Sequence, residues 1–309
     1  MKEIPLLKLA AELFSPNPNI LVGPGDDCAV VNVDSTNEAL MLLALDQVNP
    51  DVHYVDKHTT PQKIAAKLLK RNLSDIAAMG GKPAYALTSL SFSKNKNQKF
   101  CVELMKALAE CADSFNVAIC GGDISKSLYA DCFSLTIVGF VNKYKLSLRT
   151  GAQDGDLLFA TGVFGKSFET DHHLDFIPRL RESSFIAGDF SNTMIDVSDG
   201  LLLDARRIAL HSEIGLKLFC DKIPLRTSDT SLENALTDGE DYELLFAVPK
   251  EKAEDLQKNW PFSTHLSIIG EFLDEIPSGT LIDDSEKLLL NSDFCTYEIA
   301  GYEHLSSDF

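Results

Sequence analysis

Short apolar runs alternate with amphipathic segments along most of the 309-residue chain. Alternating or continuous apolar residues predict strands, which we expect at residues 28–33, 40–45, 84–92, 132–141, 157–160, 194–197, 243–248 and 266–270. Apolar residues spaced three and four apart predict helices, which we expect at residues 3–14, 60–79, 98–115 and 199–211. The mixture of the two element types indicates an α/β (α+β) fold.

The segment from Thr60 to Met79 carries the clearest helix signals. Thr60 is a suitable N-cap, and Pro61 occupies the first turn, where proline is tolerated. Much of the helix is apolar, and Asn72 and Asp75 share one polar face. This polar patch is either a cap on the core or part of a functional site.

A polar stretch at residues 142–156 is the best candidate for a domain junction. It divides the chain into an N-terminal domain, residues 1–150, and a C-terminal domain, residues 151–309. Both halves contain strands followed by Gly-Asp motifs, which suggests two related halves, although no repeat of fixed period is visible.

Composition limits the possible partners. Asp and Glu number 46 against 28 Lys and Arg, which gives a formal charge of −18. Nucleic acid is therefore not expected as a partner, because phosphate backbones bind basic surfaces. Small anionic substrates would be repelled too, unless metal ions reverse the local charge.

Cysteine usage and hydropathy bear on localisation. The chain has seven Cys and no C-x-x-C pair, so we expect reduced thiols rather than a disulfide framework or a structural zinc site. No apolar run approaches the ~18 residues of a membrane helix. The N-terminal segment lacks the apolar core of a signal peptide. We expect a cytoplasmic protein with no membrane partner.

Candidate chemistry lies in six short motifs, in most of which Asp stands beside Gly or Ser. They are Gly25-Asp26-Asp27, Leu45-Asp46, Asn72-Leu73-Ser74-Asp75, Gly121-Gly122-Asp123, Asp196-Val197-Ser198-Asp199-Gly200 and Asp238-Gly239-Glu240-Asp241. Any single motif is explained by turn chemistry. Together, with several following strand-like runs, they favour carboxylates that hold divalent cations, which in turn hold phosphates.

A different phosphate site is suggested by Ala160–Ser167, which is close to the G-x-x-x-x-G-K-[ST] loop. In that interpretation Lys166 would contact phosphates and Ser167 would hold Mg²⁺. The first Gly is missing, however, and the following residues, with two His and a Pro, form a poor helix. This interpretation also leaves the earlier Asp motifs without a role.

The motifs together resemble the thiamine-monophosphate kinase family. The resemblance is carried in order by Gly25–Ala29, Asn72–Gly80, Gly121–Asp123, Ile195–Leu201, Gly239–Leu244 and Gly301–His304. It implies the two-domain fold shared with aminoimidazole ribonucleotide synthetase, with an N-terminal mixed sheet with helices and a C-terminal α/β domain. It further implies a homodimer formed through the N-terminal sheets, with ATP and substrate in a cleft between the domains.

The reaction that this resemblance implies moves the γ-phosphoryl group of ATP to thiamine phosphate. The nucleophile is a phosphate oxygen that is already deprotonated at neutral pH, so no strong general base is required. The difficulty is the approach of two polyanions, which several Mg²⁺ ions held by carboxylates would neutralise and align. Catalysis would then consist of positioning and charge stabilisation, without a covalent enzyme intermediate.

Matching positions assign the roles that the resemblance implies. The metal ligands would be Asp27, Asp46, Asp75, Asp123, Asp196 and Asp199. ATP would be bound by Gly122, Asp123, Arg149 and Ser198, and thiamine phosphate by His53, Glu240 and Tyr302. Asp27, Asp75, Asp196 and Arg149 would carry the catalysis, with Asp26 and Asp241 as supports.

The chain departs from the family pattern around Asp46. Ala44 and Leu45 replace two hydroxyl residues, Asp51 stands where Gly is expected, and Lys166 replaces an Asp. These changes keep two alternatives open: a homodimer that binds nucleotide or thiamine without turnover, and a kinase acting on another small molecule. Residues 47–60 and 121–131 are candidate lids.

Overall fold

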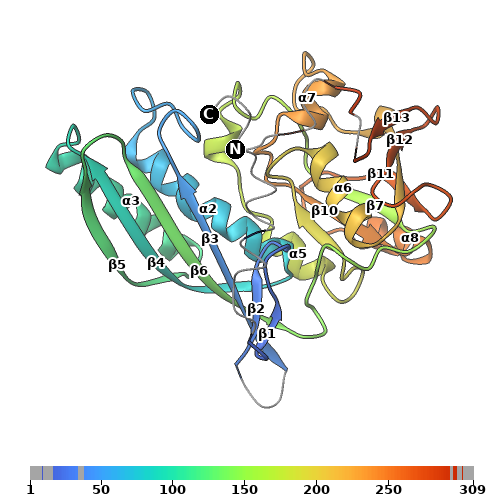
Figure 1. Cartoon of the computed structure of the whole chain (residues 1–309), viewed down its shortest axis with the longest axis horizontal. Coiled ribbons are helices and arrows are strands. Elements are labelled where there is room, and N and C mark those ends of the chain that lie inside the picture. The colour runs from blue at the N-terminus through green and yellow to red at the C-terminus, as the bar shows by residue number, and fades with distance from the viewer. Residues whose placement is uncertain (1–8, 10–16, 34–37, 293–294, 298–300, 302–309) are drawn as a thin grey trace.

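The computed structural model describes residue 9 and residues 17–33, 38–292, 295–297 and 301. Two sheets, one from each half of the chain, lie side by side with helices between and around them (Figure 1). The N-terminal sheet has the strand order β1-β2-β3-β6-β4-β5. Its strands are β1 (Ile20–Val22), β2 (Ala29–Asn32), β3 (Ala39–Val48), β4 (Lys82–Ser93), β5 (Ala118–Ser127) and β6 (Cys132–Asn142).

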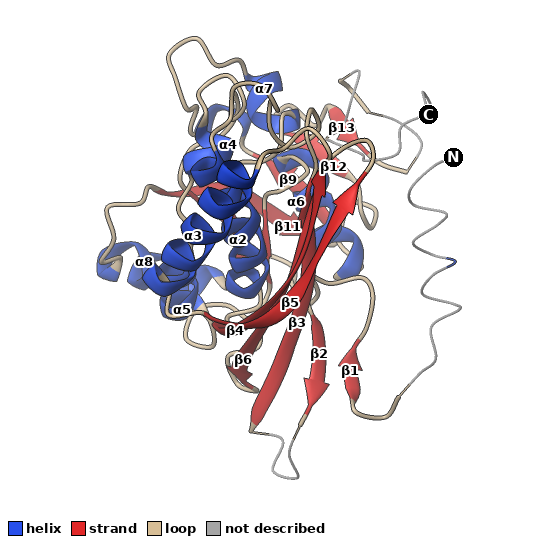
Figure 2. Ribbon diagram, turned by 90° about the vertical axis from the view of Figure 1, so that its left-hand side faces the viewer, coloured by secondary structure: helices blue, strands red, loops and turns tan. Residues whose placement is uncertain are grey.

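One face of this sheet is covered by helices α2 (Pro61–Ala78) and α3 (Gln98–Ser114), as Figure 2 shows. The Thr60 side chain accepts a hydrogen bond from the Lys63 amide and caps α2. The helix ends before Gly80, whose φ of 70° belongs to the left-handed region. Leucine and isoleucine side chains of α2 pack with those of β3 and β6 in one apolar core.

The C-terminal sheet has the order β13-β12-β9-β11-β7-β10-β8. Its strands are β7 (Leu157–Thr161), β8 (Met194–Asp196), β9 (Gly215–Leu218), β10 (Leu244–Val248), β11 (Leu266–Leu273), β12 (Leu281–Asp283) and β13 (Leu288–Leu290). The helices of this half are α4 (His172–Asp175), α5 (Leu180–Ile186), α6 (Leu201–His211), α7 (Leu232–Thr237) and α8 (Lys250–Asn259), with a 3₁₀ turn at Cys220–Lys222.

Helix α2 also joins the two halves. Ala77 and Ala78, at its C-terminal end, pack in a second apolar cluster with Ile186, Met194 and Leu244. The polar face of α2 therefore comes close to the end of β8, although the two segments are far apart in the sequence. This packing positions the functional site.

The mixed α/β architecture and most predicted elements are confirmed, including the helices at 60–79, 98–115 and 199–211. One placement was wrong: Gly121-Gly122-Asp123 lies inside β5 rather than after a strand, because β5 pairs with β4 as far as Ser127. Most of the candidate lid at 121–131 is therefore strand. The helix predicted at 3–14 lies, except for Leu9, outside the described residues.

Among the described helices, none has both the length and the apolar character needed to cross a membrane.

Candidate functional site

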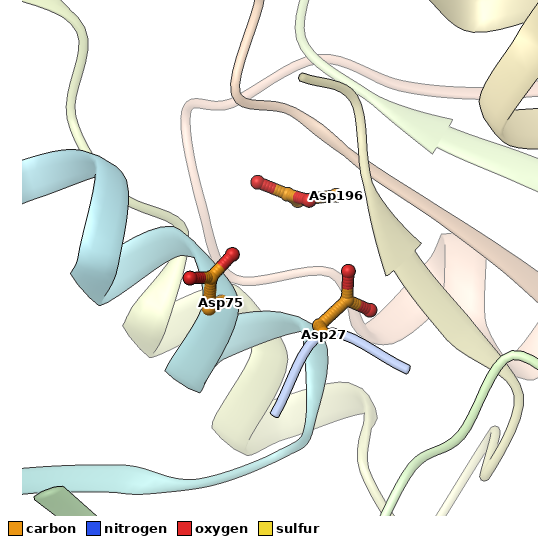
Figure 3. A group of neighbouring side chains, drawn as sticks. All are labelled: Asp27, Asp75 and Asp196. Atoms are coloured by element: carbon orange, nitrogen blue, oxygen red, sulfur yellow. The ribbon is translucent and has the colours of Figure 1, made fainter. Parts of the chain in front are cut away.

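Three carboxylates from distant segments converge where the two halves meet. Asp27 lies in the loop before β2, Asp75 on the last turns of α2, and Asp196 at the end of β8. One oxygen from each lies within 4.8 Å of the others, and the side chains point toward one another (Figure 3). Three of the six sequence motifs thus meet at one place, where α2 packs against β8.

Asp27 is held by Arg149, which follows β6. The Arg149 Nη2 atom donates to Asp27 Oδ1 at 2.6 Å, and the Arg149 amide donates to Asp26 Oδ2 at 3.2 Å. Asp27 Oδ2 is buried and has no hydrogen-bond partner among the described residues. Burial, and then the charge of Asp27, raise the pKa of Asp26 to about 6.

The other two carboxylates face strong desolvation. Burial, and then the Asp46 charge, raise the pKa of Asp75 well above its usual value. Burial, and then the Asp27 charge, do the same to the pKa of Asp196, although Ser74 Oγ donates to Asp196 Oδ2 at 2.6 Å. Three crowded carboxylates with an unpartnered buried oxygen fit a hard divalent cation, which prefers oxygen ligands.

A pocket of about 230 Å³ is lined in part by Ser198 and Asp199, which follow β8 closely. The remaining lining residues are Val52, His53, Arg71, Phe168, Glu169, Asp238, Gly239, Glu240 and Tyr242. These residues come from the loop after β3, from α2, from the loop after β7 and from residues 238–242. The pocket combines aromatic rings with several carboxylates.

Glu240 is fixed by a buried lysine. The Lys67 ammonium lies 2.8 Å from both Glu240 carboxylate oxygens and donates to the His53 carbonyl at 2.6 Å. Lys67 is fully buried. Burial lowers its pKa to about 8, although the Glu240 charge opposes that shift. Lys67 therefore ties the loop that carries His53 to the motif that carries Glu240.

The backbone of the Gly239–Leu244 motif is unusual at two positions. Glu240 and Tyr242 have φ values of 53° and 52°, in a region that costs energy for residues with a Cβ. The Glu240 and Tyr242 amides donate to the Ser198 and Val197 carbonyls. The Tyr242 ring stacks on Phe176 with centroids 4.0 Å apart. These contacts hold both side chains at the pocket.

The predicted residues do not all meet at this place. Asp46 pairs with Arg71 at 2.9 Å, and Asp199 pairs with Arg207 at 2.5 Å. Gly122 and Asp123 are exposed on β5, the edge strand of the N-terminal sheet, which lies at the left in Figure 1. His53, Ser198 and Glu240 line the pocket, whereas Tyr302 lies outside the described residues.

The segment that resembles a P-loop does not form one. Strand β7 is followed by a loop and by the four-residue helix α4, not by a long helix. Lys166 Nζ binds Asp229 at 2.6 Å. The Lys166 amide donates to Asp238 Oδ2 at 2.7 Å, while the Asp241 carboxylate accepts from the Gly165 amide and from Arg226. Asp241 thus supports this loop.

Sequence reasoning missed several residues of the site. Lys67 and Arg71 precede Asp75 at intervals of four, so the three lie along one face of α2; this spacing was the available signal. Tyr242 was visible only as part of a motif. Asp204 accepts hydrogen bonds from the backbone amides of residues 198–200, and no local pattern indicates this contact.

Three comparisons relate this chain to known proteins. Residues 25–141 match the family model of the AIR synthase related protein, N-terminal domain. The thiamine-monophosphate kinase of Rhodopirellula baltica is 35% identical over 251 residues, which cover 76% of this chain and 78% of the relative. That of Leptospira interrogans is 30% identical, covering 92% of this chain and 95% of the relative.

Among solved structures, one described as AaThiL complexed with AMPPCP and TMP superposes with a TM-score of 0.80 at 26% identity, covering 98% of this chain and 96% of the other. The structure of tt0281 from Thermus thermophilus, at 22% identity, has a TM-score of 0.79 and covers 94% and 98%; at that identity it bears on the fold alone.

Proposed function

Since this chain belongs to the thiamine-monophosphate kinase family, we propose that it transfers the γ-phosphoryl group of ATP to thiamine phosphate, giving thiamine diphosphate and ADP. The observation that carries the proposal is the convergence of Asp27, Asp75 and Asp196 beside the pocket. A related structure described as complexed with AMPPCP and TMP supports the pair of substrates.

We assign Mg²⁺ to the three converging carboxylates. Asp27, Asp75 and Asp196 would hold it, with Arg149 and Ser74 fixing two of them. Bound there, the metal would neutralise phosphate charge between the two substrates. We place the nucleotide next to Arg149 and Ser198. The Arg149 guanidinium lies 2.6 Å from Asp27 Oδ1 and would offer a positive charge to the nucleotide phosphates beside the metal. Roles in nucleotide or metal binding for Gly122 and Asp123, and a metal role for Asp199, remain proposals from the sequence.

The acceptor would enter the pocket beside these carboxylates. The Tyr242 and Phe168 rings offer apolar surface, and the Glu240 carboxylate, held by Lys67, offers a negative charge to a cationic heterocycle. His53 lies at the same wall. Tyr302 stays a proposed contact from the sequence.

Proton transfer needs no dedicated residue in this scheme, because the attacking phosphate oxygen is deprotonated at neutral pH. The residues of the chain have three tasks: to bind the two substrates, to align them, and to offset their charges. This agrees with a site made of carboxylates, arginines and aromatic rings.

The deciding experiment incubates purified protein with ATP, MgCl₂ and thiamine phosphate and identifies the product by chromatography and mass. We expect thiamine diphosphate and ADP in equal amounts. ATP consumption with another acceptor only would select a sister kinase, and calorimetric binding of thiamine phosphate without product would select a binding protein.

We also propose that the chain forms a homodimer through the open face of the N-terminal sheet. Opposite the helices, outward-facing apolar residues occupy neighbouring positions on three paired strands. They are Met41, Leu43, Leu45, Tyr85, Leu87, Val138 and Phe140. Leu45 is 63% exposed and Leu87 is 46% exposed. No described helix packs on this face (Figure 2), and apolar patches of this kind favour association.

Replacing Leu87 by Arg is expected to convert the dimer to a monomer, because a charge would be desolvated at the centre of the interface. Light scattering coupled to size-exclusion chromatography measures the mass directly. Leu210→Arg is the matched control, since Leu210 is 42% exposed on α6. A wild-type monomer, or a Leu87→Arg variant that keeps the dimer mass, contradicts the proposed interface.

A further inference from the structure

Arg71 lies between the converging carboxylates and the pocket. It is one helical turn from Asp75 on α2 and one turn from Lys67 on the other side. Its side chain is 9% exposed, and the exposed part lines the pocket. Charged side chains this well buried require partners, so the contacts of the guanidinium show how it is used.

Two of the three guanidinium nitrogens are bound to one strand. Arg71 Nε donates to Asp46 Oδ2 at 2.9 Å, and Nη1 donates to the Gln47 carbonyl at 2.6 Å. Among the described residues, Nη2 has no protein acceptor. The guanidinium is therefore fixed along one edge while it retains donor capacity toward the pocket.

Asp46 is itself held from two sides by α2. Besides accepting from Arg71, it donates its amide to Asn72 Oδ1 at 3.0 Å, and Asn72 Nδ2 donates to the Leu68 carbonyl at 2.8 Å. Asp46 does not belong to the group formed by Asp27, Asp75 and Asp196. The contact of its carboxylate with Arg71 is made through Oδ2.

The charges around the pocket are distributed unevenly. Four lining residues are acidic: Glu169, Asp199, Asp238 and Glu240. Arg71 is the one Lys or Arg side chain among the lining residues that the structure describes. The nearby Lys67 is fully buried and bound to Glu240. The pocket thus has one fixed cationic point beside a largely acidic wall, which suits a ligand with an anionic end and a cationic ring.

We propose that Arg71 binds the phosphate group of thiamine phosphate, and that Asp46 is a positioning residue for this guanidinium rather than a metal ligand. The inference rests on the proposed function, because it names the residue that binds the phosphate group of the proposed acceptor, thiamine phosphate. Arginine offers paired N–H donors to phosphate oxygens, and such charge-assisted hydrogen bonds are stronger than neutral ones. The phosphate would then lie next to Asp75 and the proposed metal, where the transfer takes place.

The test compares two ligands that differ only in the phosphate. We expect wild-type protein to bind thiamine phosphate more tightly than thiamine in calorimetry. Arg71→Met should weaken thiamine phosphate binding by about 10–100-fold, the range for hydrogen bonds to charged groups, and leave thiamine binding unchanged. Arg206→Met is the matched control, because Arg206 binds the Gly279 carbonyl and does not line the pocket, and both affinities should be retained.

Folding of the variants is checked by thermal melting. Should the Met variant fail to fold, Arg71→Lys decides, since it keeps the charge but loses the paired donors. A weaker affinity for thiamine phosphate alone supports the inference. Unchanged affinity for thiamine phosphate, or an equal loss for both ligands, overturns it.

Asp46→Asn separates positioning from metal binding. If Asp46 orients Arg71, the variant raises KM for thiamine phosphate and leaves kcat and the Mg²⁺ concentration for half-maximal rate unchanged. A raised Mg²⁺ requirement with unchanged KM would restore Asp46 to the metal ligands. If wild-type protein makes no thiamine diphosphate, the proposed function fails, while the difference in binding between the Met variant and wild type still tests Arg71.

Discussion

Replacing Asp196 by Asn is expected to lower kcat by about 10³-fold or more, because a metal contributes several kcal/mol of transition-state stabilisation. Asn keeps the shape of the side chain and removes the negative charge that would attract the cation. The Ser74 hydroxyl, which donates to Asp196 Oδ2, can still donate to the amide oxygen. The measurement is the steady-state rate of thiamine diphosphate formation over a range of MgCl₂ concentrations.

Although Asp196→Asn should lower kcat, we expect it to maintain or raise thermal stability when EDTA removes the metal. Burial raises the pKa of Asp196 well above its usual value, so the folded state disfavours the ionised form. The contribution of this group to stability is then present below the unfolded pKa of about 4 and is lost as pH rises through the folded pKa. At pH 7.5 without metal, Asp196→Asn should melt at the same temperature as wild type or higher.

Added Mg²⁺ completes this test, because a ligand stabilises the folded state that binds it. Wild-type protein should gain thermal stability with MgCl₂, and the Asp196→Asn variant should gain much less. Asp189→Asn is the control, since Asp189 is a surface carboxylate paired with Lys145; its rate and its response to Mg²⁺ should match wild type. Near-normal turnover in the Asp196→Asn variant would remove the metal assignment.

Much of this site could be predicted from the sequence because its motifs are local. In each of two motifs, a single helix or strand and the turn after it determine where the residues lie. These motifs are Asn72–Gly80 and Ile195–Leu201. Their meeting depends on Ala77 and Ala78 packing against the second half. The spacing of apolar residues does not reveal such a contact. The family resemblance did imply that the two domains meet, because it places ATP and substrate in a cleft between them.

The role of Asp46 was harder to predict. The family resemblance implies a metal ligand, which stays a prediction, and no sequence pattern indicated the contact with Arg71 that the packing of α2 on β3 creates. The Gly121-Gly122-Asp123 motif misled for a related reason. Glycines usually indicate a turn, but the pairing of β5 with β4 continues through them. In both cases contacts between distant segments determined the outcome.

Replacing Glu243 by Ala is expected to lower the free energy of unfolding by about 3 kcal/mol, because it removes the nearest acidic partner of a mostly buried arginine and leaves only the longer contact with Glu182. Glu243 accepts from Arg179 Nε at 2.6 Å and from Thr161 Oγ1 at 2.7 Å. Its side chain is 1% exposed, and that of Arg179 is 15% exposed. The single Trp, Trp260, donates to the Thr264 carbonyl next to this network. Trp260 fluorescence can therefore follow urea denaturation, and the loss of stability should appear as a lower urea concentration at the midpoint of unfolding.

The control is Glu271→Ala, which breaks the pair with Lys250, a lysine that is 69% exposed; exposed pairs contribute at most about 1 kcal/mol. The double variant Arg179→Met, Glu243→Leu should regain most of the lost stability, since it removes both charges together. Glu243 directly precedes β10 and belongs to the motif that carries Glu240, so the Ala variant should also raise KM for thiamine phosphate. A Glu243 variant no less stable than the Glu271 control would show that this ion pair does not anchor the pocket wall.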